Sequence, residues 1–213
     1  MMKHLLAALA IATFTLGSAA ASPEETAKTF IEQGVSKAIA ILQETKPDDP
    51  ARAARFRDFV DEVIDTRSVA QFTLGHYRKG ADPKLVRAFE TQFREYATAS
   101  YESRLGLYGG QTISLKNAIA RKDTDVLVKG TINAADGRHL ADVAFRVLTT
   151  AKGPQLFDVQ VEGIWLAVEQ RSQFGNFLGQ HNGDIQKLVD FLADETARLR
   201  SGDGGSGTIA AGG

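Results

Sequence analysis

Hydrophobic spacing in the first half of the chain predicts helices. From Ala27 to Leu42, apolar residues recur three and four positions apart, which is the spacing of one buried helix face. Ser22-Pro23 places an N-cap serine before a proline, and Glu25 completes a capping box that begins this helix. Lys46-Pro47 ends it. The pattern therefore predicts an amphipathic helix of about 22 residues.

Two Asp-Pro pairs begin further helices, at Asp49-Pro50 and at Asp82-Pro83. A short helix is expected between them, from Arg67 to Thr73, and Gly75 ends it. The later long helix carries four aromatic residues on one apolar face, which indicates either an ordinary core or the lining of a lipid or small-molecule cavity; periodicity alone favours the core. The two apolar faces consist of Phe56, Phe59, Val60, Val63 and Ile64, and of Leu85, Val86, Phe89, Phe93, Tyr96, Ala97 and Tyr101.

After Gly109-Gly110 the apolar period changes to two, which is typical of strands. Turn clusters at 133–137 and 151–154 separate the later segments. This pattern predicts a four-stranded antiparallel sheet with one apolar face. The alternating positions are Ile113, Leu115 and Asn117, then Val126, Val128 and Ile132, then Val143, Phe145 and Val147, then Phe157, Val159 and Val161.

Two amphipathic helices follow the strands, one near Val168 to Leu178 and one from about Gly183 to Arg200. Helices, then strands, then helices is an α+β order rather than the alternation that builds a parallel sheet. Because at least five amphipathic helices are available for a single apolar sheet face, helices cupped over a curved sheet can leave an apolar cavity between the layers.

The N-terminus reads as an export signal. Lys3 and His4 precede an apolar stretch from Leu5 to Leu16, and the small residues 19–21 form a cleavage site. We therefore expect residues 1–21 to be a signal peptide, residues 22–200 to form a single α+β domain, and the Gly-rich residues 201–213 to be a disordered tail. Export predicts a periplasmic protein.

Composition excludes several kinds of chemistry. The chain has no cysteine, so it has no disulfide framework and no thiolate nucleophile. Its formal charge of −1 argues against a nucleic-acid partner. The isolated histidines His76, His139 and His181 lack metal-ligand spacing, and no nucleophile-elbow or phosphate-loop motif is present. We expect no cofactor, no metal and no enzymatic activity.

Asp158 and Glu162 are the one carboxylate pair that could do acid–base work. They lie four residues apart on a predicted strand, hence about 13 Å apart on one face. That separation exceeds the range of both classes of two-carboxylate glycosidase. Strand alternation places both on the solvated face. The alternative hypothesis is an NTF2-like small-ligand enzyme that uses Asp158 or Glu162.

Several segments together resemble the MlaC family of periplasmic lipid carriers, also called toluene-tolerance auxiliary proteins. The segment 157–164 (FDVQVEGI) is similar to the family's strand end, and 171–174 (RSQF) to its following helix. The segments 69–77 and 89–108 are similar to its glycine turn and its Phe- and Tyr-rich central helix. This chain has Tyr77 where the family often has Trp, and Trp165 where it often has Ser. The resemblance covers about Pro23 to Leu199.

The resemblance implies an NTF2-like curved sheet with added helices and acyl chains held between the layers. It further implies a carrier of phospholipid between an inner-membrane ABC-type Mla complex and an outer-membrane lipoprotein–porin complex. A hopanoid-like cargo is an alternative that the residues do not separate from phospholipid. The inward phase of each element predicts the residues that line the cavity. They are Phe56, Phe59, Val60, Val63, Phe89, Phe93, Tyr96, Tyr101, Val143, Phe145, Val159 and Val161.

Overall fold

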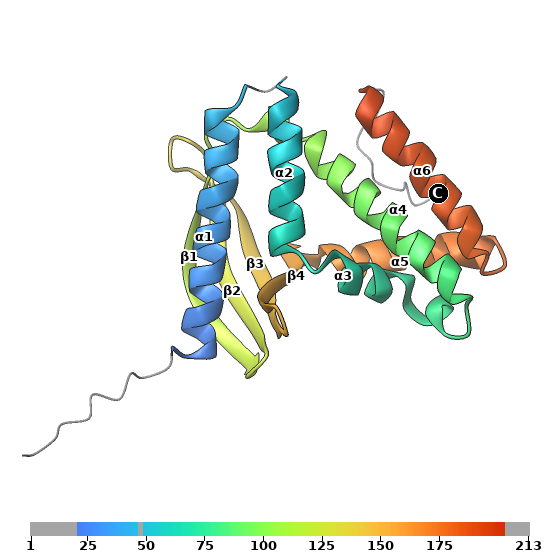
Figure 1. Cartoon of the computed structure of the whole chain (residues 1–213). Coiled ribbons are helices and arrows are strands. Elements are labelled where there is room, and N and C mark those ends of the chain that lie inside the picture. Colours follow the sequence, from blue (N-terminus) through green and yellow to red (C-terminus); the bar gives the residue numbers. More distant parts are fainter. Residues whose placement is uncertain (1–20, 47–48, 203–213) are drawn as a thin grey trace, which may run out of the picture.

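The computed structural model describes residues 21–46 and 49–202 and has an α+β architecture. The expected signal peptide, except its last residue, and the expected tail beyond residue 202 lie outside the described residues. Four helices precede an antiparallel sheet and two follow it within these ranges (Figure 1). None of the described helices is long and apolar enough to cross a membrane. The helices are α1 (Pro23–Glu44), α2 (Pro50–Val63), α3 (Thr66–Leu74), α4 (Pro83–Glu102), α5 (Leu166–Gln180) and α6 (Ile185–Ser201).

The three helix starts that the sequence predicts from a capping residue followed by proline are confirmed. Ser22 and Glu25 form the reciprocal hydrogen bonds of a capping box at the start of α1. Asp49 and Asp82 each accept a hydrogen bond from the backbone N–H two residues later and precede a proline. Each cap satisfies backbone donors that have no partner inside the helix. Local sequence chemistry thus decides where these helices begin.

Within the described residues the sheet has five strands, so the prediction of four is corrected. They follow the order β1 (Thr112–Lys122), β2 (Asp125–Asn133), β3 (His139–Thr150), β4 (Gly153–Val161) and β5 (Ile164–Trp165), each antiparallel to its neighbour. Glu162 and Gly163 both adopt positive φ angles, 49° and 83°, which is the backbone of a two-residue hairpin turn. The chain therefore folds back at Glu162, and Ile164 pairs with Val161.

Helix α1 packs against one face of the sheet (Figure 1). Ala27 and Ile31 of α1 are buried together with Val128 of β2 and Phe145 of β3. These strand residues belong to the alternating positions that the sequence indicates as apolar. The sheet core therefore lies between α1 and the strands.

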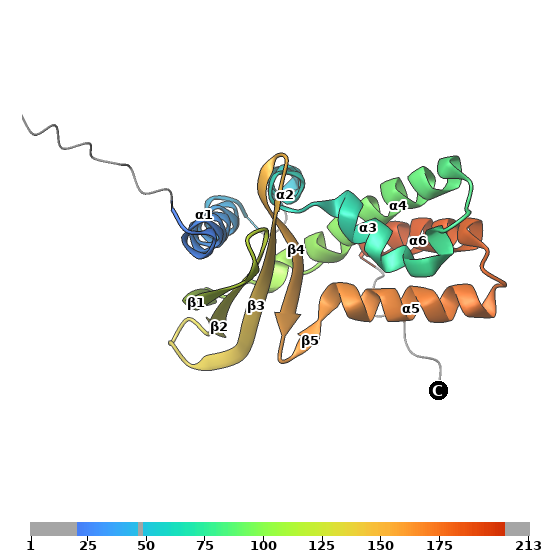
Figure 2. The same cartoon turned by 90° about the horizontal axis from the view of Figure 1, so that it is seen from below.

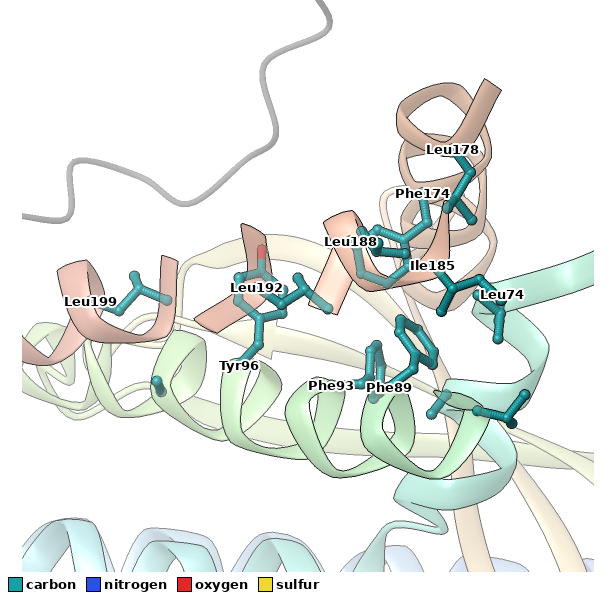
Figure 3. Packing of buried hydrophobic residues seen from close by; sticks show 13 residues of the cluster. Leu74, Phe89, Phe93, Tyr96, Phe174, Leu178, Ile185, Leu188, Leu192 and Leu199 are labelled. Carbon is teal, nitrogen blue, oxygen red and sulfur yellow. The ribbon is translucent and has the colours of Figure 1, made fainter. Parts of the chain in front are cut away.

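Helices α3, α4, α5 and α6 form a second core. Phe89 and Phe93 on α4 face Phe174 on α5 with edge-to-face ring geometry, at centroid distances of 5.8 and 6.1 Å (Figure 3). Leu188 and Leu192 on α6 complete this cluster. Seen from below, α5 runs from β5 away from the sheet toward these helices (Figure 2). The aromatic face of α4 therefore packs largely against other helices rather than against the sheet.

Candidate functional site

A pocket with a volume of about 280 Å³ lies between β4 and helices α2 to α5. Val60 of α2 and Val69 of α3 contribute to its wall, and Phe93 and Ala97 of α4 lie opposite β4. Phe93 also belongs to the helical core, so the pocket opens directly beside that core. The arrangement offers a mostly apolar space bounded by rigid elements, as in ligand pockets generally.

Two tyrosines of α4 line this pocket. Tyr96 is buried, and burial raises the pKa of its phenol. Tyr101 has 37% of its surface exposed, and the burial of its phenol raises its pKa as well. Both phenols therefore remain neutral at physiological pH, which suits an apolar ligand.

Asp158 is buried in the pocket wall, with 6% of its surface exposed, so the expectation of a solvated carboxylate at this position is wrong. The reason is that α3 and α5 pack against the face of β4 to which alternation assigns Asp158, so this face is covered rather than solvated. A β-bulge in β4 adds Phe157 to the same side. Arg146 pairs with Asp158 and Val147 pairs with Leu156, which leaves Phe157 as the extra residue. Leu156 therefore joins the sheet core, and Phe157 turns instead toward α3 and the pocket.

The Asp158 carboxylate caps the start of α5. Its Oδ1 accepts hydrogen bonds from the backbone N–H groups of Val159 and Ala167, both at 2.8 Å. The N-cap residue of α5, Trp165, makes no side-chain capping hydrogen bond. Asp158, on β4, instead provides the acceptor for a backbone N–H in the first turn of α5. Burial raises the pKa of Asp158, and the two N–H groups and the Arg146 charge oppose that rise.

Glu162 lies outside the pocket wall. Its side chain accepts a hydrogen bond from the backbone N–H of Asp142 at 2.6 Å, and its own N–H donates to the Asp142 carbonyl at 3.0 Å. Glu162 therefore ties the turn after β4 to β3. The two carboxylates considered as an acid–base pair do not share a site.

A chain of ring and cation contacts joins the sheet to the helices beside the pocket. The Arg146 guanidinium lies over the Phe157 ring at 5.1 Å, and Phe157 meets Phe72 of α3 edge-on at 5.5 Å. The Arg171 guanidinium of α5 lies over the Phe72 ring at 5.0 Å. These contacts fix α3 and α5 against β4.

A second, shallower hollow of about 320 Å³ adjoins the pocket. It lies between the C-terminal end of α1, helix α2 and the segment 105–111. Phe56 lines it, with its ring 6.4 Å from that of Tyr101. Tyr101 and Arg104 line both spaces. The end of α4 is thus the partition between the pocket and the hollow.

The twelve residues predicted to line a cavity are dispersed by the structure. One group lines the pocket: Val60, Phe93, Tyr96, Tyr101 and Val159. Phe56 lines the hollow, and Phe59, whose ring is tilted against that of Phe56 at a centroid distance of 5.8 Å, lines neither space. The others lie elsewhere: Phe89 in the helical core, Val143 and Phe145 in the sheet core, Val63 buried at the end of α2, and Val161 half-buried before the turn.

Sequence reasoning missed other residues of the wall. Phe157 reaches it through the bulge, which alternation does not reveal, and Asp158 reaches it because α5 covers a strand face that was expected to be solvated. Leu166 and Ala167 reach it because α5 begins directly after β5. Arg104 lies beyond the predicted apolar face of α4, and its position in the sequence carries no signal for a pocket.

Comparison with known proteins agrees with this fold. A solved structure of a phospholipid-binding protein from Ralstonia solanacearum, in complex with a phospholipid, superposes with a TM-score of 0.69 at 23% sequence identity. The match covers 82% of this chain and 98% of that chain, and it shows the shared fold. No curated protein sequence matches the chain. The family model described as MlaC protein matches residues 32–194, which is more than half of the chain; the protein therefore belongs to the MlaC family.

Proposed function

We propose that the protein is a carrier that binds phospholipid by its acyl chains in the pocket between β4 and helices α2 to α5. The observation that carries this proposal is an apolar pocket of about 280 Å³ in a member of the MlaC family. The phospholipid bound to the Ralstonia protein of the same fold supports it.

The physical requirement for such a carrier is shelter for hydrocarbon. An acyl chain loses about 0.8 kcal/mol for each CH₂ that enters water, so two chains of about 16 carbons require roughly 20 kcal/mol of protection. An apolar pocket keeps the part of the hydrocarbon that it encloses out of water, and a polar head group can remain in water. The lining by Val60, Phe93 and Val159 suits hydrocarbon.

We further propose that the carrier works in the periplasm and moves lipid between the inner-membrane ABC-type Mla complex and the outer-membrane lipoprotein–porin complex. The export pattern of residues 1–21 and the family membership support this proposal. A hopanoid-like lipid is an alternative cargo with the same need for an apolar pocket.

Vesicle transfer tests the carrier function. Donor vesicles with a labelled phospholipid are mixed with unlabelled acceptor vesicles, with and without substoichiometric mature protein. A carrier accelerates appearance of the label in the acceptors in proportion to protein concentration. Transfer at the spontaneous rate at every protein concentration would overturn the proposal.

Asp158 supports a second candidate function, a small-ligand enzyme, because a buried carboxylate with a raised pKa lies on the pocket wall. The capping bonds to Val159 and Ala167 give this carboxylate a structural role that favours the carrier. The two candidates differ in what leaves the pocket. A carrier releases lipid of unchanged mass after incubation with liposomes, whereas an enzyme releases a product of altered mass.

A further inference from the structure

Arg104 occupies the junction between the pocket and the hollow. It follows the last turn of α4, where its backbone N–H donates to the Tyr101 carbonyl at 3.0 Å. Its own carbonyl accepts from the Leu107 N–H, also at 3.0 Å. These bonds hold the start of the side chain in place, and the side chain lines both spaces.

The Arg104 charge is available to a ligand. Within the part of the chain that the structure describes, its guanidinium has no carboxylate within ion-pair distance. The neighbouring Glu102 is engaged by Arg57 at 2.6 Å. The acidic residues of the pocket wall belong to β4 and α5, where Asp158 accepts two backbone N–H groups and Glu169 accepts from Gln173. An anion at the pocket is therefore drawn to the end of α4.

The pocket volume suits one acyl chain rather than two. An apolar cavity of about 150 Å³ holds one benzene molecule, which has six carbons. A pocket of about 280 Å³ scales to roughly a dozen carbons, most of one membrane acyl chain. A second chain of the same lipid needs another apolar surface.

The adjoining hollow provides that surface. It has a comparable volume of about 320 Å³, and among the described residues that line it Arg104 is the only charged one. Leu107 lies at its edge with 77% of its surface exposed, so a bound chain would remove apolar area from water there. Because the hollow and the pocket share Tyr101 and Arg104, one lipid can reach both.

We propose that Arg104 binds the phosphate of a two-chain phospholipid, with one acyl chain in the pocket and the other in the hollow. The planar guanidinium can donate two parallel hydrogen bonds to phosphate oxygens. This inference rests on the proposed function and adds to it a head-group site and a chain arrangement. It makes the phosphate, and not only the hydrocarbon, a determinant of cargo.

Paired cargoes test the phosphate site. Delipidated mature protein is loaded from vesicles that contain either phosphatidylglycerol or diacylglycerol with identical chains. Wild type should prefer the phosphate-bearing lipid by about tenfold. Arg104→Gln should bring this ratio close to one, and Arg104→Lys should keep part of the preference. Arg87→Gln, at an exposed arginine of α4 outside both spaces, is the matched control and should keep all of it.

The outcomes separate the two proposals. If Arg104→Gln keeps both the lipid preference and the loading of wild type, the phosphate site is overturned while the carrier function stands. Failure of wild type to load either lipid would overturn the proposed function itself. Equal loading of both lipids by wild type would refute the phosphate site alone.

The hollow has its own test. Leu107→Asn should weaken loading of phosphatidylglycerol several-fold and leave loading of its single-chain lyso form unchanged, because only the second chain meets Leu107. An equal loss for both lipids, or no loss for either, would contradict the two-space arrangement.

Discussion

Asp125 and Arg146 form a two-bond ion pair on the sheet face opposite α1. Arg146 donates to both carboxylate oxygens of Asp125, at 3.0 and 2.9 Å. The Arg146 guanidinium holds the pKa of Asp125 below its usual value. Arg146 also covers the Phe157 ring, so this pair supports the strand that forms the pocket wall.

The Asp125→Asn variant should unfold more easily at neutral pH, by about 1.5–3 kcal/mol, because a hydrogen-bonded charge pair is broken. Since the folded pKa of Asp125 is lowered, its stabilisation is complete above the unfolded pKa and is lost as pH falls through the folded pKa. The difference in the free energy of unfolding between wild type and Asp125→Asn, measured by urea unfolding at pH 7 and at successively lower pH, should shrink in acid. Asp142→Asn, at an exposed carboxylate 3.8 Å from Lys116, is the control and should change little. A gap that persists unchanged in strong acid would contradict this account.

Asp158 makes the opposite pH prediction. Burial raises its folded pKa above the unfolded value, so its charge costs stability progressively as pH rises between the two values. Asp158→Asn keeps an oxygen acceptor for the start of α5 and escapes that cost. Asp158→Ala leaves the Ala167 N–H without its partner and should lose about 1–2 kcal/mol. Equal thermal stability of Asp158→Ala and Asp158→Asn at pH 7 would refute the capping role.

At the scale of elements, local chemistry explains which segments were predictable. Ser22-Pro23, Asp49-Pro50 and Asp82-Pro83 begin helices because their side chains cap the first turn, which is information held within a few residues. The fifth strand, Ile164–Trp165, is too short to show a period. The bulge at Phe157 depends on how β4 pairs with β3, so the spacing of apolar residues within β4 does not reveal it.

Gly130 shows how closely the strands of the sheet approach. A Cβ atom at this position of β2 would lie 2.6 Å from the Ser114 carbonyl oxygen of β1. Gly130→Ala should therefore destabilise the protein by about 1–3 kcal/mol, because the strands must separate. Gly34→Ala, in the interior of α1 with nothing within 4 Å of the new Cβ, should instead stabilise it by about 0.5–1 kcal/mol. If chemical denaturation shows that the free energy of unfolding changes in the same direction in both variants, this account of the sheet is contradicted.

At the scale of the whole molecule, the pocket is a product of how two cores meet. The apolar face of α4 is visible in the sequence, but its division between core and pocket depends on α5 and α6, which bury Phe89 in the helical core, whereas Ala97 also lines the pocket. Val143 and Phe145 face α1 rather than the pocket because α1 occupies the apolar sheet face. Such choices between partners are made by tertiary packing, so periodicity identifies buried residues without assigning them to a core or a site.

Ala97→Trp should block cargo by filling the pocket from α4. Displacing only two methylene groups costs about 1.6 kcal/mol of shelter, so loading should fall at least about tenfold. Ala88→Trp, the same change at an exposed position of the same helix, is the matched control and should load normally. Equal loading of labelled phospholipid by both variants, each with a wild-type circular dichroism spectrum, would place the cargo outside this pocket.

The central claim is that the protein binds phospholipid, and mass spectrometry of extracted lipid tests it most directly. Mature protein is purified under native conditions, extracted with organic solvent and analysed for lipid, and the delipidated protein is then incubated with liposomes and analysed again. We predict phospholipid in the first extract and its return in the second, in close to one molecule per protein chain. An absence of lipid from both extracts would contradict the account.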